Sequence, residues 1–313
     1  MKRESTRSME GPQLPTVADP PEAHADWIEL MSLTSPDHYV AWADHQRDLR
    51  ISGLDESEDA SLEDLEPIID TVITETSERK EACGNRKESY PFEITEQGLR
   101  CLPEAPRSAY VFQLLLSLFG RSAGPPGSYG DRLFEDLSAA ALLSYLGKAQ
   151  EGLEVRIFGF PRRIGASGFR EAVDELCRSL GEGVQCKDAP EVDDQKDAHL
   201  DLVAWRRFPG SNPGHMIAFG QCATGVNWFH KIHELRPKEW CQLWLQEPPL
   251  VTPVATFFLP RRAERLEWRR ASVYGGIVFD RCRISWLLPE VPEGLASEIL
   301  PWTQHVLTVG GTR

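Results

Sequence analysis

The stretch LDLVAWRRFPGSNPGHMIAFGQCATGVNWFHK, residues 200–231, decides the fold of the second half of the chain. It contains two apolar runs, LDLVAWRRF and HMIAFGQC, joined by the turn-forming sequence PGSNPG. Apolar runs of this length, separated by Gly, Pro and Asn, predict two adjacent strands. Asp201 opens the first strand and Gln221 closes the second, so we expect both side chains at the same end of the pair.

An aspartate at the head of so apolar a strand is costly to bury unless it is paired or binds a metal ion. Mg²⁺ suits the position, because it prefers oxygen ligands and usually takes only one or two of them from the protein. Gln221 can supply a neutral oxygen. The plain alternative is that Asp201 pairs with Arg206 or Lys196, while Gln221 satisfies backbone groups at the strand end.

Two further residues complete the candidate site. The sequence VNWFHKIHEL, residues 226–235, predicts a helix capped at Thr224, and Lys231 lies far enough into it to swing its ammonium back towards Asp201. Glu135 lies in the first turn of a helix predicted over residues 131–146. The plain alternative for Lys231 is a solvated surface lysine. The plain alternative for Glu135 is an acid that stabilises the helix N-terminus through the helix dipole.

The surrounding chain alternates strands and helices, which predicts a mixed α/β fold. We expect strands at 89–94, 153–160, 254–259 and 274–280, and helices within 23–75 and over 110–120 and 169–180. The Gly- and Pro-rich segment 121–130 is the clearest break. We therefore predict a disordered tail over residues 1–22, an acidic and mostly helical domain over 23–125, and a second domain over 126–313.

The net charge of −14 is unevenly distributed. Residues 1–100 hold 23 Asp and Glu against 10 Lys and Arg, whereas residues 255–285 hold seven arginines against three acids. Phosphate binding depends on local basic surface, so the composition permits a nucleic-acid partner for the second domain. The chain has no phosphate-loop, GxGxxG, HExxH or GxSxG motif, which removes the usual marker of the corresponding enzyme classes.

Seven scattered cysteines without a CxxC pair predict reduced thiols and a cytoplasmic location. A zinc site from Cys222, His230, His233 and Cys241 is an alternative, although the cysteines lack the usual close spacing. A cysteine-dependent enzyme using Cys222 and His230 is another. No apolar run is long enough to predict a membrane span.

The order of these elements and residues resembles the PD-(D/E)xK nuclease superfamily. The resemblance rests on this order of elements: a helix with Glu135, a strand, a strand opened by Asp201, a strand closed by Gln221, a helix with Lys231 and a further strand. The resemblance implies a restriction-endonuclease-like αβββαβ core with a mixed sheet. It departs from the family in two places: residue 223, where the family lysine falls, is Ala, and the helix over 169–180 is an insertion.

The resemblance also implies an activity. Members of this superfamily hydrolyse phosphodiester bonds with Mg²⁺, or Mn²⁺, and by resemblance Asp201, Gln221 and Glu135 hold the metal while a migrated Lys231 assists. Flanking phosphates would contact Arg162, Arg163, Arg206 and Arg207.

We therefore expect a metal-dependent nuclease of a prokaryotic defence or restriction system, acting on DNA rather than RNA. The acidic first domain is expected to bind a protein partner, and an oligomer is compatible with the sequence. The alternative is a catalytically silent subunit that keeps the fold and serves as a protein or nucleic-acid interaction module.

Overall fold

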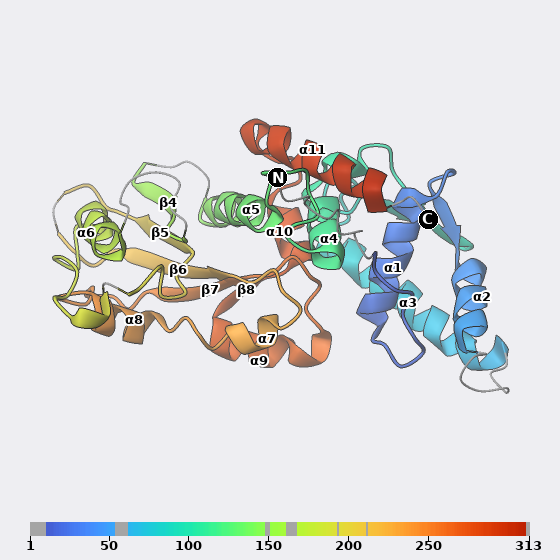
Figure 1. The fold of residues 1–313 in the computed structure, drawn as a ribbon, viewed down its shortest axis with the longest axis horizontal. Helices are drawn as coiled ribbons and strands as arrows, with labels where there is room; N and C mark the ends of the chain where they lie inside the picture. The colour runs from blue at the N-terminus through green and yellow to red at the C-terminus, as the bar shows by residue number, and fades with distance from the viewer. Residues whose placement is uncertain are drawn as a thin grey trace, which may run out of the picture. The chain divides into compact units, whose positions relative to one another are not determined.

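The computed structural model describes residues 11–53, 62–147, 151–160, 168–192, 194–210 and 212–310. In this part of the chain it contains eleven α-helices and two β-sheets (Figure 1), so the predicted mixed α/β class is confirmed at that level. The chain divides into two units, which are described separately: residues 1–133 with 281–313 form unit 1, and residues 134–280 form unit 2.

Unit 1 is mostly helical and also carries a small antiparallel sheet in the order β1-β3-β2. Its elements are α1 (Pro21–Thr34), β1 (Tyr39–Ala41), α2 (Trp42–Gly53), α3 (Leu62–Ala82), β2 (Phe92–Ile94), β3 (Gly98–Cys101), a 3-10 turn (Ala105–Arg107), α4 (Ala109–Phe119), α10 (Arg281–Leu287) and α11 (Glu293–Gly310). The predicted tail falls partly outside the described residues, and its last two residues already belong to α1. Glycine ends α4 as expected, because Gly120 has a φ of 80°.

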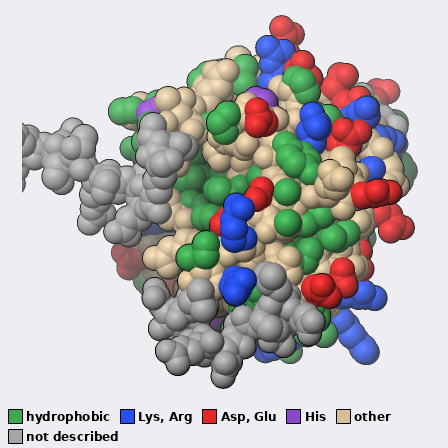
Figure 2. All heavy atoms as spheres, turned by 90° about the vertical axis from the view of Figure 1, so that its right-hand side faces the viewer, with side chains coloured by type: hydrophobic (Ala, Val, Ile, Leu, Met, Phe, Trp, Pro, Cys, Tyr) green, Lys and Arg blue, Asp and Glu red, His purple; other side chains and the backbone are tan. Residues whose placement is uncertain are grey.

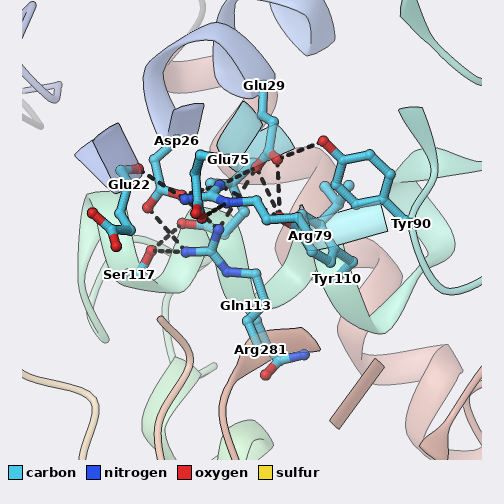
Figure 3. Close-up of polar contacts among 12 residues, drawn as sticks. Glu22, Asp26, Glu29, Glu75, Arg79, Tyr90, Tyr110, Gln113, Ser117 and Arg281 are labelled. Atoms are coloured by element: carbon cyan, nitrogen blue, oxygen red, sulfur yellow. Dashed lines mark hydrogen bonds and ion pairs between the residues drawn. The ribbon is translucent and has the colours of Figure 1, made fainter. Parts of the chain in front are cut away.

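The end of the chain belongs to unit 1, whereas the sequence placed it in the second domain. A buried ion-pair network explains this difference (Figure 3). Arg281 of α10 donates to both carboxylate oxygens of Asp26 in α1, at 2.7 and 3.0 Å, and to the Ser117 hydroxyl at 2.9 Å. Arg79 of α3 donates to Asp26 at 2.7 Å and to Glu29 at 3.0 Å. The two guanidinium groups therefore connect helices from both ends of the chain.

These charges are buried but compensated. Both arginine side chains have no exposed area, and Tyr90 and Tyr110 donate their hydroxyl hydrogens to Glu29. Burial alone would raise the pKa of Asp26, yet Arg281 and Arg79 hold it at about 2. Asp26 is therefore charged at neutral pH because its partners replace the water it has lost.

Unit 2 is built on one five-stranded mixed sheet in the order β4-β5-β6-β7-β8. Its elements are α5 (Gly130–Tyr145, beginning in unit 1), β4 (Leu153–Ile157), α6 (Phe169–Leu180), a 3-10 turn (Pro190–Val192), β5 (Leu202–Arg206), β6 (Met216–Cys222), α7 (Trp228–Lys231), α8 (Pro237–Trp244), β7 (Val254–Phe258), α9 (Arg265–Gly275) and β8 (Ile277–Phe279). Strand β5 is antiparallel to both of its neighbours, β4 and β6, whereas β7 and β8 run parallel to β6. The hairpin predicted from residues 200–222 is β5–β6.

Helices cover both faces of this sheet. On one face, Val203 and Phe219 pack in a core cluster with residues of α6 and α8, and Phe257 packs in a neighbouring cluster with α7 and α9. On the other face, Phe258 stacks on Phe279, and Tyr145 of α5 meets Phe279 edge-on. Because β5 is buried on both sides, its sequence reads as an apolar run rather than an alternating one.

Candidate functional site

Asp201 is held at one end of the sheet, directly before β5. Its N–H donates to the Gly220 carbonyl at 2.9 Å, and its carbonyl accepts from the N–H groups of Phe158 and Gly159 at 2.6 and 3.1 Å. The carboxylate Oδ2 accepts from the N–H of Cys222 at 2.6 Å. The residue is therefore fixed between the ends of β4 and β6, and its side chain orientation is set by the backbone of β6.

The carboxylate of Glu135, from α5, converges with that of Asp201. A Cβ placed on Gly159 would lie 3.3 Å from Asp201 Oδ1 and 3.5 Å from Glu135 Oε1. Both oxygens thus border the space left by the missing side chain of Gly159. Two carboxylate oxygens from separate elements, meeting at an unfilled position, form a donor arrangement that suits a hard cation.

The electrostatic surroundings of Asp201 differ from those of Asp26 in unit 1. Burial raises the pKa of Asp201 to about 7, and Asp197 and Glu234 add to the rise. The N–H of Cys222 and the charge of Lys231 act in the opposite direction but do not offset burial. The carboxylate is half-buried among acids with only an exposed lysine to balance them, which is the condition that a bound cation relieves.

Gln221 lies beside this site but turns its amide towards another acid. Its Nε2 donates to Glu234 Oε2 at 2.9 Å, and the same Glu234 oxygen lies 3.2 Å from Nδ1 of His199. The side chain of Gln221 is only 4% exposed. Its Oε1 is buried and has no hydrogen-bond partner within the described part of the chain. A buried amide oxygen without a donor is a candidate ligand for a cation.

Lys231 reaches the site from a much shorter helix than the sequence predicted. The expected ten-residue helix is wrong in length, because α7 spans only Trp228–Lys231. A new helix, α8, begins at Pro237, and the residue before it, Arg236, is extended with φ −118° and ψ 100°. Proline disfavours helical dihedrals in the residue before it, so the chain cannot continue as one helix through Arg236 into α8. The end of α7 at Lys231, five residues earlier, has no such local cause. Ala223, at the family's usual lysine position, is fully buried in the core.

The arginines proposed to hold phosphates are not brought to this site. Arg206 ends β5, five residues after Asp201, which places it roughly 17 Å along the strand at about 3.3 Å per residue. Arg207 donates to the carbonyl of Ser179 at 3.2 Å, an anchor at the end of α6. Arg162 and Arg163 lie outside the described residues.

Two features of the site were not found by reading the sequence. Glu234 interacts with both Gln221 and Asp201, and its only signal is its position three residues after Lys231. Immediately before Asp201, Ala198 and His199 both have left-handed backbones, with φ of 52° and 66°. The Asp197 carboxylate accepts from the His199 N–H at 2.9 Å and holds this turn. Left-handed non-glycine residues are costly and concentrate at functional sites.

The zinc and cysteine alternatives are not favoured by the geometry. Among the residues that the structure describes, no group of three or more His, Cys, Asp or Glu side chains is placed to hold a metal ion. This applies to Cys222, His230, His233 and Cys241, and equally to Asp201 with its neighbouring acids. Burial and the carboxylates of Asp201 and Glu135 raise the pKa of the Cys222 thiol well above its usual range. A thiolate nucleophile is therefore disfavoured.

Comparison of the chain with family models, curated proteins and solved structures finds no match. The interpretation of the site rests on its own residues. Their oxygen donors fit Mg²⁺ or Mn²⁺, since such ions commonly take one or two protein carboxylates and complete their coordination with water and phosphate.

Proposed function

We propose that unit 2 is a metal-dependent nuclease that hydrolyses phosphodiester bonds, with DNA as the preferred substrate. The observation that carries this proposal is the convergence of Asp201 Oδ1 and Glu135 Oε1 on the space at Gly159. Asp201 is also a carboxylate whose pKa is raised to about 7 by burial. A perturbed acid that meets a second carboxylate at a strand end is a candidate for a functional site.

The order of the elements supports the same proposal. Helix α5 precedes the antiparallel strands β4, β5 and β6, and β7 follows parallel to β6 after intervening helices. With α6 set aside, this order is compatible with the αβββαβ core that the resemblance to the PD-(D/E)xK superfamily implies. Helix α6 is inserted between β4 and β5, where it packs against the sheet.

The chain's own residues have distinct tasks in this proposal. Asp201 and Glu135 hold the cation, and the unpartnered Oε1 of Gln221 is a third donor. The bound metal supplies charge that polarises the phosphate and lowers the pKa of an attacking water. Lys231 places a mobile positive charge over the site and stabilises the charge that develops on the phosphate oxygens.

A catalytically silent subunit is the second candidate, and two observations favour it. Gln221 stands where the family usually has a carboxylate, and its amide is committed to Glu234. Ala223 is buried at the usual lysine position, so no lysine can replace it there without disrupting the core. A silent subunit of this fold would bind nucleic acid or protein without binding a metal at Asp201.

A protein partner for unit 1 and a role in prokaryotic defence belong to the same proposal. Figure 2 shows one face of unit 1, on which acidic and basic side chains lie among exposed hydrophobic ones. Such a mixed surface suits a protein better than a phosphate backbone. No helix in the described part of the chain is long and apolar enough to cross a membrane.

The test is cleavage of plasmid, linear duplex, single-stranded DNA and RNA in Mg²⁺, Mn²⁺ or EDTA. Asp201→Asn and Lys231→Ala are compared with Glu239→Gln and Arg178→Ala, exposed positions on α8 and α6. We expect metal-dependent cleavage that only the first two variants lose. Cleavage that survives Asp201→Asn refutes the site. Absence of both cleavage and Mn²⁺ binding in calorimetry supports the silent subunit instead.

A further inference from the structure

A row of three ring side chains with an arginine at one end lies on α9 and on the segment that begins with α7. The guanidinium of Arg270 lies over the ring of Phe229, 4.5 Å from its centre. Phe229 contacts His233 at a centroid distance of 6.2 Å, and His233 contacts Tyr274 at 4.2 Å. Two segments separated by about thirty residues therefore present one continuous row, which we call the α7–α9 surface. Both helices lie close together in unit 2 (Figure 1).

The outer side of α9 is unusually apolar for a face exposed to water. Leu266 is 93% exposed, Val273 is 70% exposed and Tyr274 is 48% exposed. With Arg270, these residues follow the i, i+4, i+7, i+8 spacing of a single helix face. The opposite side of α9 packs Ala271 into the core of unit 2. Exposed apolar residues grouped with aromatic ones mark a binding surface rather than a solvated helix.

The same surface gathers positive charge in a chain whose net charge is −14. Residues 229–238 and 261–274 hold eight Lys and Arg against three Glu. Arg262 is paired with Asp280 at 2.9 Å. Arg269 and Arg270 are exposed, and neither forms an ion pair with a carboxylate of the described chain. A guanidinium stacked on a ring keeps its edge N–H groups available for phosphate.

We propose that the α7–α9 surface binds a single strand of nucleic acid. Bases stack on Tyr274 and His233, and backbone phosphates contact Arg269 and Arg270. Rings can stack only on bases that are not already stacked in a duplex, so this row favours a single strand over a double helix. An acidic protein would match the charge but has no need of the ring faces, which is why the nucleic acid is favoured.

The surface is continuous with the candidate site. His233 contacts Tyr274, and the next residue, Glu234, accepts a hydrogen bond from Gln221. Lys231 lies between Phe229 and His233 in the chain. A strand held on this surface therefore passes the Asp201 end of the sheet. This inference deepens the proposed nuclease function by assigning its substrate class, and in that respect it rests on that function.

The experiment measures binding without cleavage. Fluorescence anisotropy is recorded in EDTA for a labelled single-stranded DNA, the matching duplex and a single-stranded RNA, using the full chain. We expect the single strands to bind more tightly than the duplex, and the DNA and RNA arms identify which strand is preferred. Tyr274→Ala is expected to weaken binding by about tenfold, the loss of one base–aromatic stack. Tyr274→Trp is expected to retain it. Phe208→Ala, at a ring that is more exposed than Tyr274 (73% against 48%), is the control and is expected to bind like wild type.

The arginines are tested through salt dependence. Replacing Arg269 and Arg270 together by Ala removes two phosphate contacts, which lowers the slope of log K against log salt by about 1.4 for a single strand. Arg178→Ala, on the exposed side of α6, is the matched control.

The proposal is overturned if the duplex binds as tightly as the single strand, if no oligonucleotide binds, or if a folded Tyr274→Ala binds like wild type. Binding in EDTA is independent of catalysis. Binding without metal-dependent cleavage therefore refutes only the nuclease function, and cleavage with unchanged Tyr274→Ala binding refutes only this surface.

Discussion

Gly159→Ala is the most direct test of the space between the two carboxylates. The added methyl carbon would lie 3.3 Å from Asp201 Oδ1 and 3.5 Å from Glu135 Oε1. Mg²⁺ binds its ligands at about 2.0–2.1 Å and fills its remaining positions with water. A methyl group in contact with both oxygens takes the place of such a water. We therefore expect the dissociation constant for Mn²⁺ to rise at least about tenfold, a loss of about 1.4 kcal/mol.

The fold should tolerate the change. Gly159 does not have the left-handed backbone that would require glycine, and no backbone atom lies closer than 3.7 Å to the new methyl carbon. Replacing glycine by alanine also reduces the entropy of the unfolded chain, which stabilises by about 0.4–1 kcal/mol and offsets the close contact with Asp201. The free energy of unfolding is therefore expected to change by less than about 1 kcal/mol.

The assay is calorimetry with Mn²⁺ at pH 8, where Asp201, with its pKa of about 7, is charged. Gly168→Ala is the control, since a Cβ there meets no atom within 4 Å. Asp201→Asn removes the central carboxylate and shows the calorimetric signal of a protein without the proposed Mn²⁺ site. If folded Gly159→Ala binds Mn²⁺ as tightly as wild type, the ion does not occupy the space shared by Asp201 and Glu135, and the reasoning fails.

Three further predictions concern stability. Because the folded pKa of Asp201 is raised from 3.8 to about 7, the free energy of unfolding should fall by up to about 1.4 kcal/mol per unit as pH rises between them; urea titrations of Asp201→Asn should lack this decline. His45 lies 3.0 Å from His24, and burial lowers its pKa from 6.5 to about 4, so stability should decline as pH falls from 6.5 to 4, and His45→Phe should reduce that decline in acid denaturation. Arg281→Met should destabilise unit 1 by about 3–5 kcal/mol in urea unfolding, since it leaves Asp26 buried with half of its partners; a loss below about 1 kcal/mol would contradict that role.

Elements with strong local signals could be predicted from the sequence. The hairpin of residues 200–222 follows from two apolar runs and a Pro- and Gly-rich turn, and the stripe of α6 ends at Gly181 as its sequence indicates. The same local signals place Asp201 and Gln221 at one end of the sheet. Local sequence failed at α7, because apolar periodicity continues through residues 226–235 while the helix ends at Lys231.

Contacts between distant residues could not be predicted. Asp26 and Arg281 are 255 residues apart, and nothing near either residue indicates the other. The same holds for Gly159, whose missing side chain matters only because Glu135 and Asp201 approach it from other elements. The left-handed turn at Ala198 was also hidden, because alanine gives no sign of that conformation in a sequence.

The contrast between Asp26 and Asp201 motivates the proposal of a ligand at Asp201. Asp26 is buried with two arginines, and its pKa falls to about 2. Asp201 is half-buried with Asp197 and Glu234 nearby, and its pKa rises to about 7. In unit 1 the charge of the buried Asp26 is thus balanced by two arginines. In the described part of unit 2 no arginine balances Asp201, which lies where strand ends and the left-handed turn at Ala198 and His199 meet. Under the proposed function, a divalent cation would supply the missing positive charge. If so, Mg²⁺ should lower the pKa of Asp201 and raise the melting temperature of the wild type but not of Asp201→Asn.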